Sequence, residues 1–186
     1  REAEEGATSV YLVDRVIPML PEKLSNELCS LKPHEDRLTF STVFEMDDEA
    51  KVKDVWIGRT VIHSDQRFAY EDAQELIEGK QDIYTKEVVT LNKLAGKLRD
   101  MRFANGAVNF ETTEVRFRLD EEGNPLEVVP KVRKDAHKMI EEFMLLANKK
   151  VAEFVYQYKK RKEKNTFVYR VHDYPDITKI QEFSDF

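Results

Sequence analysis

The sequence predicts an α+β fold in which a mixed, mainly antiparallel sheet packs against long helices. Residues 37–46 and 51–63 alternate between apolar and polar side chains, as half-buried strands do. The polar run 47–49 between them is typical of a hairpin turn. Apolar side chains recur every three to four residues across 83–103 and 134–162, which predicts two long helices with one buried face each. Hairpin-joined strands interrupted by helices define the α+β class.

The segment before the first hairpin is irregular. Residues 8–16 are rich in β-branched and aromatic side chains, and the two prolines that follow exclude the interior of a helix. A short helical turn is expected at 21–25, because proline fits the first turn of a helix. Residues 26–33 are predicted to form a loop, in which Cys29 is interpreted as a buried structural thiol.

The end of the first long helix and the shorter elements can also be predicted. The first long helix is predicted to end near Asn105-Gly106, because glycine commonly follows the last turn of a helix. The other elements are a helix at 70–78, strands at 108–110 and 114–119, a turn at 120–125, strands at 126–129 and 166–171, and a helix at 173–180.

The length and composition of the chain limit the classes of protein to which it can belong. The chain has 186 residues, of which 41% are hydrophobic and 35% charged, so it has room for one ordinary domain or two very small ones and is not a disordered tail. No apolar run approaches the roughly 20 residues of a membrane helix, so no membrane partner is expected. A single cysteine excludes an internal disulfide framework and favours a cytoplasmic setting. The first residue is Arg1 rather than methionine, and no secretory signal precedes the domain, which favours a piece of a longer protein.

The charge is unevenly distributed. Thirty Lys and Arg against 36 Asp and Glu give a net charge of −6, which by itself disfavours a nucleic-acid partner. Residues 149–164, however, carry seven basic side chains against two acidic ones. This run permits a local polyanion-binding face, and an ordinary solvated helix surface is the alternative interpretation.

The residues show no self-sufficient active site. The acidic groups at 47–48 and 120–122 fall in turns, where carboxylates normally face water, and the pair at 141–142 falls in a helix. The four histidines lack ligand spacing, and the chain has neither a glycine-rich phosphate loop nor a nucleophile elbow. Tyr11 and Phe110 are either ordinary apolar anchors or platforms on which a base could stack. From residues alone, the sequence indicates an α+β binding module.

Three colinear segments carry a resemblance to a known family. Residues 7–31 include Pro18-Met19-Leu20-Pro21 and, further on, Leu24-Ser25-Asn26 ahead of Cys29-Ser30-Leu31. With the segments at 106–111 and 139–148, they closely resemble the RNB catalytic domain of the ribonuclease II/ribonuclease R exoribonucleases, in its ribonuclease R branch. The resemblance covers the whole chain, and it implies that residues 1–186 are the central part of an RNB domain that is truncated at both ends.

The resemblance implies an activity. Members of that family degrade single-stranded RNA processively from the 3′ end and release nucleoside 5′-monophosphates. They hold Mg²⁺ with an Asp-x-x-x-x-x-Asp-x-Asp-Asp cluster, since two divalent ions polarise the phosphate and stabilise the leaving oxygen. Neither that cluster nor the family's downstream Ser-Pro-Ile-Arg segment is present in this chain. The Mg²⁺ ligands are therefore expected only in the intact enzyme, and the chain alone is expected to be inactive.

The resemblance also implies four substrate-binding residues. Tyr11 matches the tyrosine that stacks on the 3′-terminal base, and Phe110 matches the aromatic residue on the other side of that clamp. Tyr70 matches a tyrosine that seats the RNA, and Glu141 a glutamate tied to sugar recognition. A carboxylate can accept a hydrogen bond from the 2′-OH, so single-stranded RNA is the expected partner and DNA is not. Without the resemblance, Glu141 is equally well read as a charge near the helix N-terminus.

Two alternatives remain open at this point. Instead of part of an exoribonuclease, the alternatives are a non-catalytic RNA-binding module and a structural and interaction module that uses its long helix as a partner surface. A shortened domain also exposes surface that its flanks would cover, which favours self-association of the chain.

Overall fold

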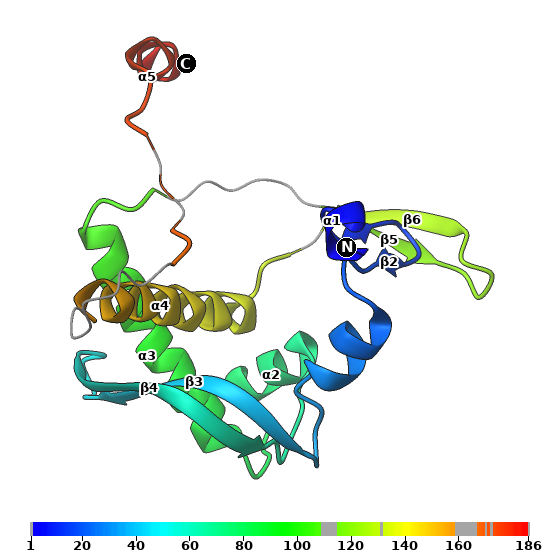
Figure 1. Ribbon diagram of the computed structural model, residues 1–186, viewed down its shortest axis with the longest axis horizontal. Helices are drawn as coiled ribbons and strands as arrows, with labels where there is room; N and C mark the ends of the chain where they lie inside the picture. The colour runs from blue at the N-terminus through cyan, green and yellow to red at the C-terminus, as the bar shows by residue number, and fades with distance from the viewer. Residues whose placement is uncertain are drawn as a thin grey trace. The chain divides into compact units, whose positions relative to one another are not determined.

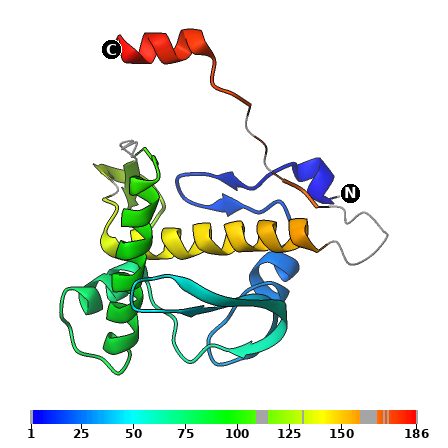
Figure 2. The ribbon, with the colours of Figure 1, turned by 90° about the vertical axis from the view of Figure 1, so that its left-hand side faces the viewer.

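The computed structural model describes residues 2–108, 115–130, 132–158, 167–169, 171 and 173–185, and it confirms the α+β class (Figures 1 and 2). The chain divides into two units, Arg1–Leu146 and Ala147–Phe186, and the boundary falls inside one helix. The elements in chain order are α1 (Glu2–Gly6), β1 (Val10–Tyr11), β2 (Val16–Ile17), the π-helical η1 (Lys23–Leu28), β3 (Asp36–Met46), β4 (Val52–His63), α2 (Tyr70–Ile77), α3 (Thr85–Ala104), β5 (Val115–Leu119), β6 (Pro125–Pro130), α4 (Asp135–Gln157) and α5 (Ile177–Ser184).

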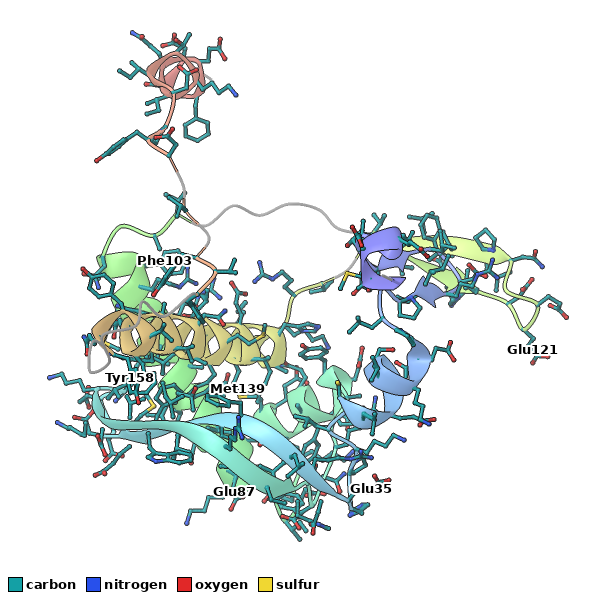
Figure 3. All side chains as sticks on the ribbon, in the orientation of Figure 1. Glu35, Glu87, Phe103, Glu121, Met139 and Tyr158 are labelled. Atoms are coloured by element: carbon teal, nitrogen blue, oxygen red, sulfur yellow. The ribbon has the colours of Figure 1, made fainter. Side chains whose placement is uncertain are left out.

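In the part of the chain that the structure describes, the strands form three separate antiparallel pairs rather than one sheet. β1 pairs with β2, β3 with β4, and β5 with β6, each with its neighbour in sequence. Within the described ranges, no strand of one pair continues the ladder of another. Two strands that are neighbours in the sequence can pair after closing only a short loop, which costs little entropy. Helical segments separate one strand pair from the next in the sequence. Glu121 marks the turn of the β5–β6 hairpin in Figure 3.

The predicted hairpin is confirmed as β3–β4, and its turn is built around Asp47. One carboxylate oxygen accepts hydrogen bonds from the backbone N–H groups of Glu49 and Lys51 at 3.0 and 2.8 Å. The other pairs with Lys53 at 2.8 Å. The hydrogen bond from Lys53, with those from the backbone, lowers the pKa of Asp47 below its ordinary value. The acidic turn residue therefore stabilises the hairpin more when it is ionised than when it is protonated.

The apolar side of β3 is only partly covered. Leu38 and Phe40 remain 86% and 70% exposed, whereas Phe44 on the same parity is partly buried. On the opposite side, the hydroxyl groups of Thr39 and Ser41 each lie 2.6 Å from that of Thr60 and are partly buried. The alternation predicted the strand correctly but not which side would be covered along its whole length. Self-association through such exposed surface stays a prediction.

Local hydrogen bonds mark both ends of the long helix α3. The hydroxyl of Thr85 accepts a hydrogen bond from the backbone of Asp82 at 2.7 Å. At the other end, Gly106 adopts a φ of +91°, and its N–H donates to the carbonyl of Phe103 at 2.9 Å. A side chain would strain that backbone conformation, so the predicted stop at Asn105-Gly106 is confirmed.

The core lies among α2, α3 and α4. Small and medium apolar side chains fill it, and Met139, labelled in Figure 3, is 5% exposed. The buried apolar residues of these helices are Ala73, Leu76, Val88, Ala95, Ala136 and Met139. The Arg102 guanidinium on α3 contacts both carboxylate oxygens of Glu142 on α4, at 2.5 to 3.2 Å. Glu142 is 4% exposed, so α3 and α4 are joined by a largely buried ion pair.

The second unit contains the rest of α4 and α5. The Asp176 side chain accepts a hydrogen bond from the N–H of Thr178 at 2.8 Å and caps α5, which begins at 177 rather than at the predicted 173. The strand predicted at 166–171 is wrong for its described residues, 167–169 and 171, which form no strand. Val168 is 91% exposed, and β-branched residues form a strand only where a partner and a packed face exist. The long helix predicted to reach 162 ends at Gln157, and Tyr158 is not helical, whereas 159–162 lie outside the described residues.

Two smaller points complete the fold. The helical turn expected at 21–25 continues to Leu28 as η1, and Cys29 after it is exposed, so the interpretation of a buried thiol is wrong. The residue follows the end of a surface helix, where apolar neighbours in sequence do not amount to a core. Among the described residues, no helix combines the length and the apolar character that a membrane crossing requires.

We predict an asymmetric effect of breaking the Arg102–Glu142 pair. Arg102→Met leaves a buried carboxylate without its partner and should lower the free energy of unfolding by about 3–5 kcal/mol. Glu142→Leu leaves a guanidinium that is already 33% exposed and can turn to water, so its cost should stay below about 2 kcal/mol. Urea unfolding followed by circular dichroism measures both.

The control for this pair is Arg118→Met. Arg118 forms an exposed ion pair with Glu127 at 3.1 Å, and its replacement should cost no more than about 1 kcal/mol. A loss for Arg102→Met no larger than that for Arg118→Met would show that the buried carboxylate does not depend on its partner.

Candidate functional site

The start of α4 is held by a side chain of α2. The backbone N–H of Ala136 donates to the side-chain oxygen of Gln74 at 3.0 Å, and both residues are buried. The first N–H groups of a helix have no partner within the helix, so a side chain from a neighbouring element can satisfy one of them. The Gln74 amide also donates to Glu78 at 2.9 Å, which fixes its orientation. The first turn of α4 is therefore fastened to α2.

A stacked ring pair lies at the same junction. Tyr70, the first residue of α2, stacks on His137 of α4 with ring centroids 4.1 Å apart and ring planes 10° from parallel. The backbone N–H of Lys134 approaches the His137 Nδ1 at 3.3 Å, so this nitrogen is the acceptor. Tyr70 remains 46% exposed although the imidazole covers one ring face. Part of the tyrosine therefore stays accessible to a ligand.

Glu141 follows His137 by one turn of α4. Residues four apart share one face of a helix, so the carboxylate lies on the same side of α4 as the stacked rings. The guanidinium of Arg133, which precedes the helix, contacts a Glu141 oxygen, and the Glu141 side chain is 39% exposed. The hydrogen bonds that Arg102 donates to Glu142 raise the pKa of Arg102, and the charge of Glu141 adds to that effect. Glu141 therefore lies near two guanidinium groups.

The structure brings together two of the four residues that the sequence predicted. Tyr70 stacks on His137 of α4, and Glu141 lies one turn further along that helix. Tyr11 lies on β1 and is 79% exposed, and within the described residues no contact joins it to this group. Phe110 lies outside the described residues. The clamp of Tyr11 and Phe110 around a terminal base therefore stays a prediction.

Sequence reasoning missed Arg133 and His137. The histidines were judged only by the spacing of metal ligands, which His137 does not have. A different signal was present, because Arg133, His137 and Glu141 follow one another at intervals of four residues. That interval predicts a common helix face, although Arg133 comes just before the helix.

The carboxylates of the described residues do not fit a Mg²⁺ site. No group of three or more His, Cys, Asp or Glu side chains in the described part of the chain is arranged to hold a metal ion. Asp120 accepts hydrogen bonds from the backbone and side chain of Asn124, which lower its pKa. Glu141 and Glu142 contact arginines. These oxygens already bind protein donors rather than converge on one point.

An open cavity lies between α3 and the first half of α4. Its volume is about 280 Å³, and small side chains on α3 leave the space. Its lining residues are Asn92, Ala95, Gly96, Arg99, Asp135, Lys138, Met139 and Glu142. Phe103, labelled in Figure 3 near the end of α3, lies under the Arg99 and Arg102 guanidinium groups at 5.3 and 5.0 Å. The cavity lining combines the positive charges of Arg99 and Lys138 with the negative charges of Asp135 and Glu142.

The chain is similar to named proteins along its whole length. It is 40% identical over 203 residues to DIS3-like exonuclease 2 of Schizosaccharomyces pombe, covering all of this chain and 21% of that protein. It is 38% identical over 192 residues to Ribonuclease R 1 of Lactococcus lactis, covering all of this chain and 23% of that protein. The chain therefore spans less than a quarter of the length of either relative.

A solved structure shares the fold. Mycoplasma genitalium RNase R in complex with ribose methylated single-stranded RNA superposes with a TM-score of 0.85 at 29% identity, over 99% of this chain and 29% of that one. The family model described as the RNB domain matches residues 1–186. The colinear segments, the fold and the matched length together place this chain in the RNB domain family.

Proposed function

We propose that this chain is part of a 3′-to-5′ exoribonuclease that hydrolyses single-stranded RNA processively to nucleoside 5′-monophosphates. Its own task is to hold RNA by base stacking and by recognition of the sugar. Membership in the RNB family supports the activity, and the RNA in the complex of Mycoplasma genitalium RNase R supports the substrate class. Mg²⁺ is the metal proposed for the intact enzyme, with ligands outside this chain.

The arrangement at the start of α4 is the observation that carries the proposal. A partly exposed tyrosine is backed by a parallel imidazole, and an accessible carboxylate lies one helical turn away. Every nucleobase has a flat face, so a ring platform binds RNA of any sequence. A carboxylate accepts a hydrogen bond from the ribose 2′-OH, which DNA lacks. The two groups together suit an enzyme that accepts any RNA sequence and rejects DNA.

Replacement of Glu141 tests sugar recognition. Glu141→Gln removes the charge at nearly constant shape, so affinity for single-stranded RNA should fall about tenfold while affinity for the DNA of the same sequence stays unchanged. Fluorescence anisotropy with labelled oligonucleotides measures both. Glu127→Gln is the matched control, because Glu127 is also an exposed glutamate paired with an arginine. An equal loss for RNA and DNA would contradict a role in reading the 2′-OH.

Replacement of the two clamp residues tests base stacking. Tyr11→Ala and Phe110→Ala together should abolish measurable RNA binding, because stacking contributes about 1–3 kcal/mol per base. Tyr174→Ala serves as the control, since Tyr174 is a tyrosine that is 95% exposed in the second unit. Unchanged affinity of the Tyr11 and Phe110 variant would remove the stacking assignment.

The chain alone should not cleave RNA. A homogeneous sample with Mg²⁺ should release no nucleotides from an end-labelled single-stranded RNA, because the family's aspartate cluster is not part of this sequence. Gel electrophoresis of the reaction resolves any shortening. Metal-dependent trimming from the 3′ end would refute this prediction. If the chain does not respond to RNA, and a salt titration shows no dependence of the kind that phosphate contacts give, the alternative of an interaction module is favoured.

A further inference from the structure

Arg133 stands between the β5–β6 hairpin and α4. Strand β6 ends at Pro130 and α4 begins at Asp135, so the arginine lies on the short connection that leads into the helix. Its guanidinium reaches past the first turn of α4 to a carboxylate oxygen, Oε2, of Glu141. Both side chains are partly exposed, at 48% and 39%. The contact therefore holds a solvent-accessible carboxylate from one side.

A carboxylate whose orientation is fixed by a hydrogen bond binds a ligand with a smaller loss of side-chain entropy than one that rotates freely. A glutamate side chain on a helix surface rotates among several rotamers, and a ligand that needs one of them must overcome the entropy of the others. A hydrogen bond to Oε2 restricts this rotation in advance. A carboxylate has about four acceptor positions on its two oxygens, so Oε1 stays able to accept a further hydrogen bond.

Contacts of the neighbouring residues restrict the Arg133–Glu141 ion pair further. The Lys134 N–H approaches the His137 ring, which holds the connection against the first turn of α4. Lys138 is paired with Asp135 at 3.1 Å. Among the described residues, the ion pair of Glu141 is with Arg133.

We propose that Arg133 is a positioning residue, which orients the Glu141 carboxylate so that its second oxygen accepts a hydrogen bond from a ribose 2′-OH. Arg133 sets the preference for RNA over DNA through Glu141 and does not itself bind the nucleic acid. The proposal rests on the proposed function, because it requires Glu141 to recognise the sugar. It adds a residue that the sequence did not single out and assigns it to selectivity rather than to overall affinity.

A double-mutant cycle tests the proposal. The unchanged chain, Arg133→Met, Glu141→Gln and the double variant are titrated with a labelled single-stranded oligoadenylate, its deoxy counterpart and its 2′-O-methyl counterpart. Arg133→Met should lower the ratio of RNA to DNA affinity about 3- to 10-fold, a part of the loss expected for a hydrogen bond to a charged group. In the Glu141→Gln background the same change should have no further effect on that ratio. Arg133→Lys, which keeps the charge without the forked geometry, should restore part of the preference.

Two controls separate positioning from folding and from phosphate binding. Arg118→Met removes an arginine from a comparable exposed ion pair and should leave the RNA-to-DNA ratio unchanged. Thermal unfolding followed by circular dichroism should show similar stability for Arg133→Met and the unchanged chain, because exposed pairs contribute little. The dependence of RNA affinity on salt should also be unchanged.

Several results would overturn the proposal. Equal losses of RNA and DNA affinity, with a salt slope reduced by about 0.7, would show that Arg133 binds a phosphate instead. An equal effect of Arg133→Met with and without Glu141→Gln would show that it does not act through Glu141. An unchanged ratio for Arg133→Met beside a lowered ratio for Glu141→Gln would overturn this inference and leave the proposed function intact. An unchanged ratio for Glu141→Gln, or a chain that binds neither RNA nor DNA, would overturn both.

Discussion

The buried ion pair between Arg102 and Glu142 is the contact on which the candidate site depends. Glu142 is 4% exposed, so its carboxylate has lost water and relies on the guanidinium for its hydrogen bonds. The Gln74 side chain adds a second directed contact at the first turn of α4. Apolar packing tolerates rotation of one helix against another, whereas hydrogen bonds of fixed direction do not. These two contacts therefore set the rotation of α4 about its own axis.

That rotation decides which side chains of α4 are accessible. Ala136, Met139 and Glu142 recur at three-residue steps and are buried. His137 and Glu141 lie about 100° and about 140° around the helix from Ala136. His137 stacks on Tyr70, and Glu141 is partly exposed. Two adjacent glutamates thus have different tasks. Glu142 joins the helices, and Glu141 is available for a ligand.

The proposed division of labour follows from the chemistry of RNA. Stacking and recognition of the 2′-OH need rings and an acceptor, and neither depends on base identity. Bond breaking needs carboxylates that converge on metal ions, and in the described part of the chain no group of three or more His, Cys, Asp or Glu side chains is arranged to hold one. The chain matches less than a quarter of the length of the relatives that it resembles. Holding the substrate is the task that we propose for its own residues.

Short-range interactions could be predicted from the sequence, and long-range ones could not. The turn at Asp47 and the helix stop at Gly106 depend on neighbouring residues, and both were predicted correctly. The family also followed from sequence, because its segments are colinear. Only the tertiary structure decided that Tyr70 stacks on His137, that Cys29 is exposed and that Val168 and its described neighbours form no strand. Each of these depends on what packs against a residue, and local patterns carry no record of partners that are distant in the chain.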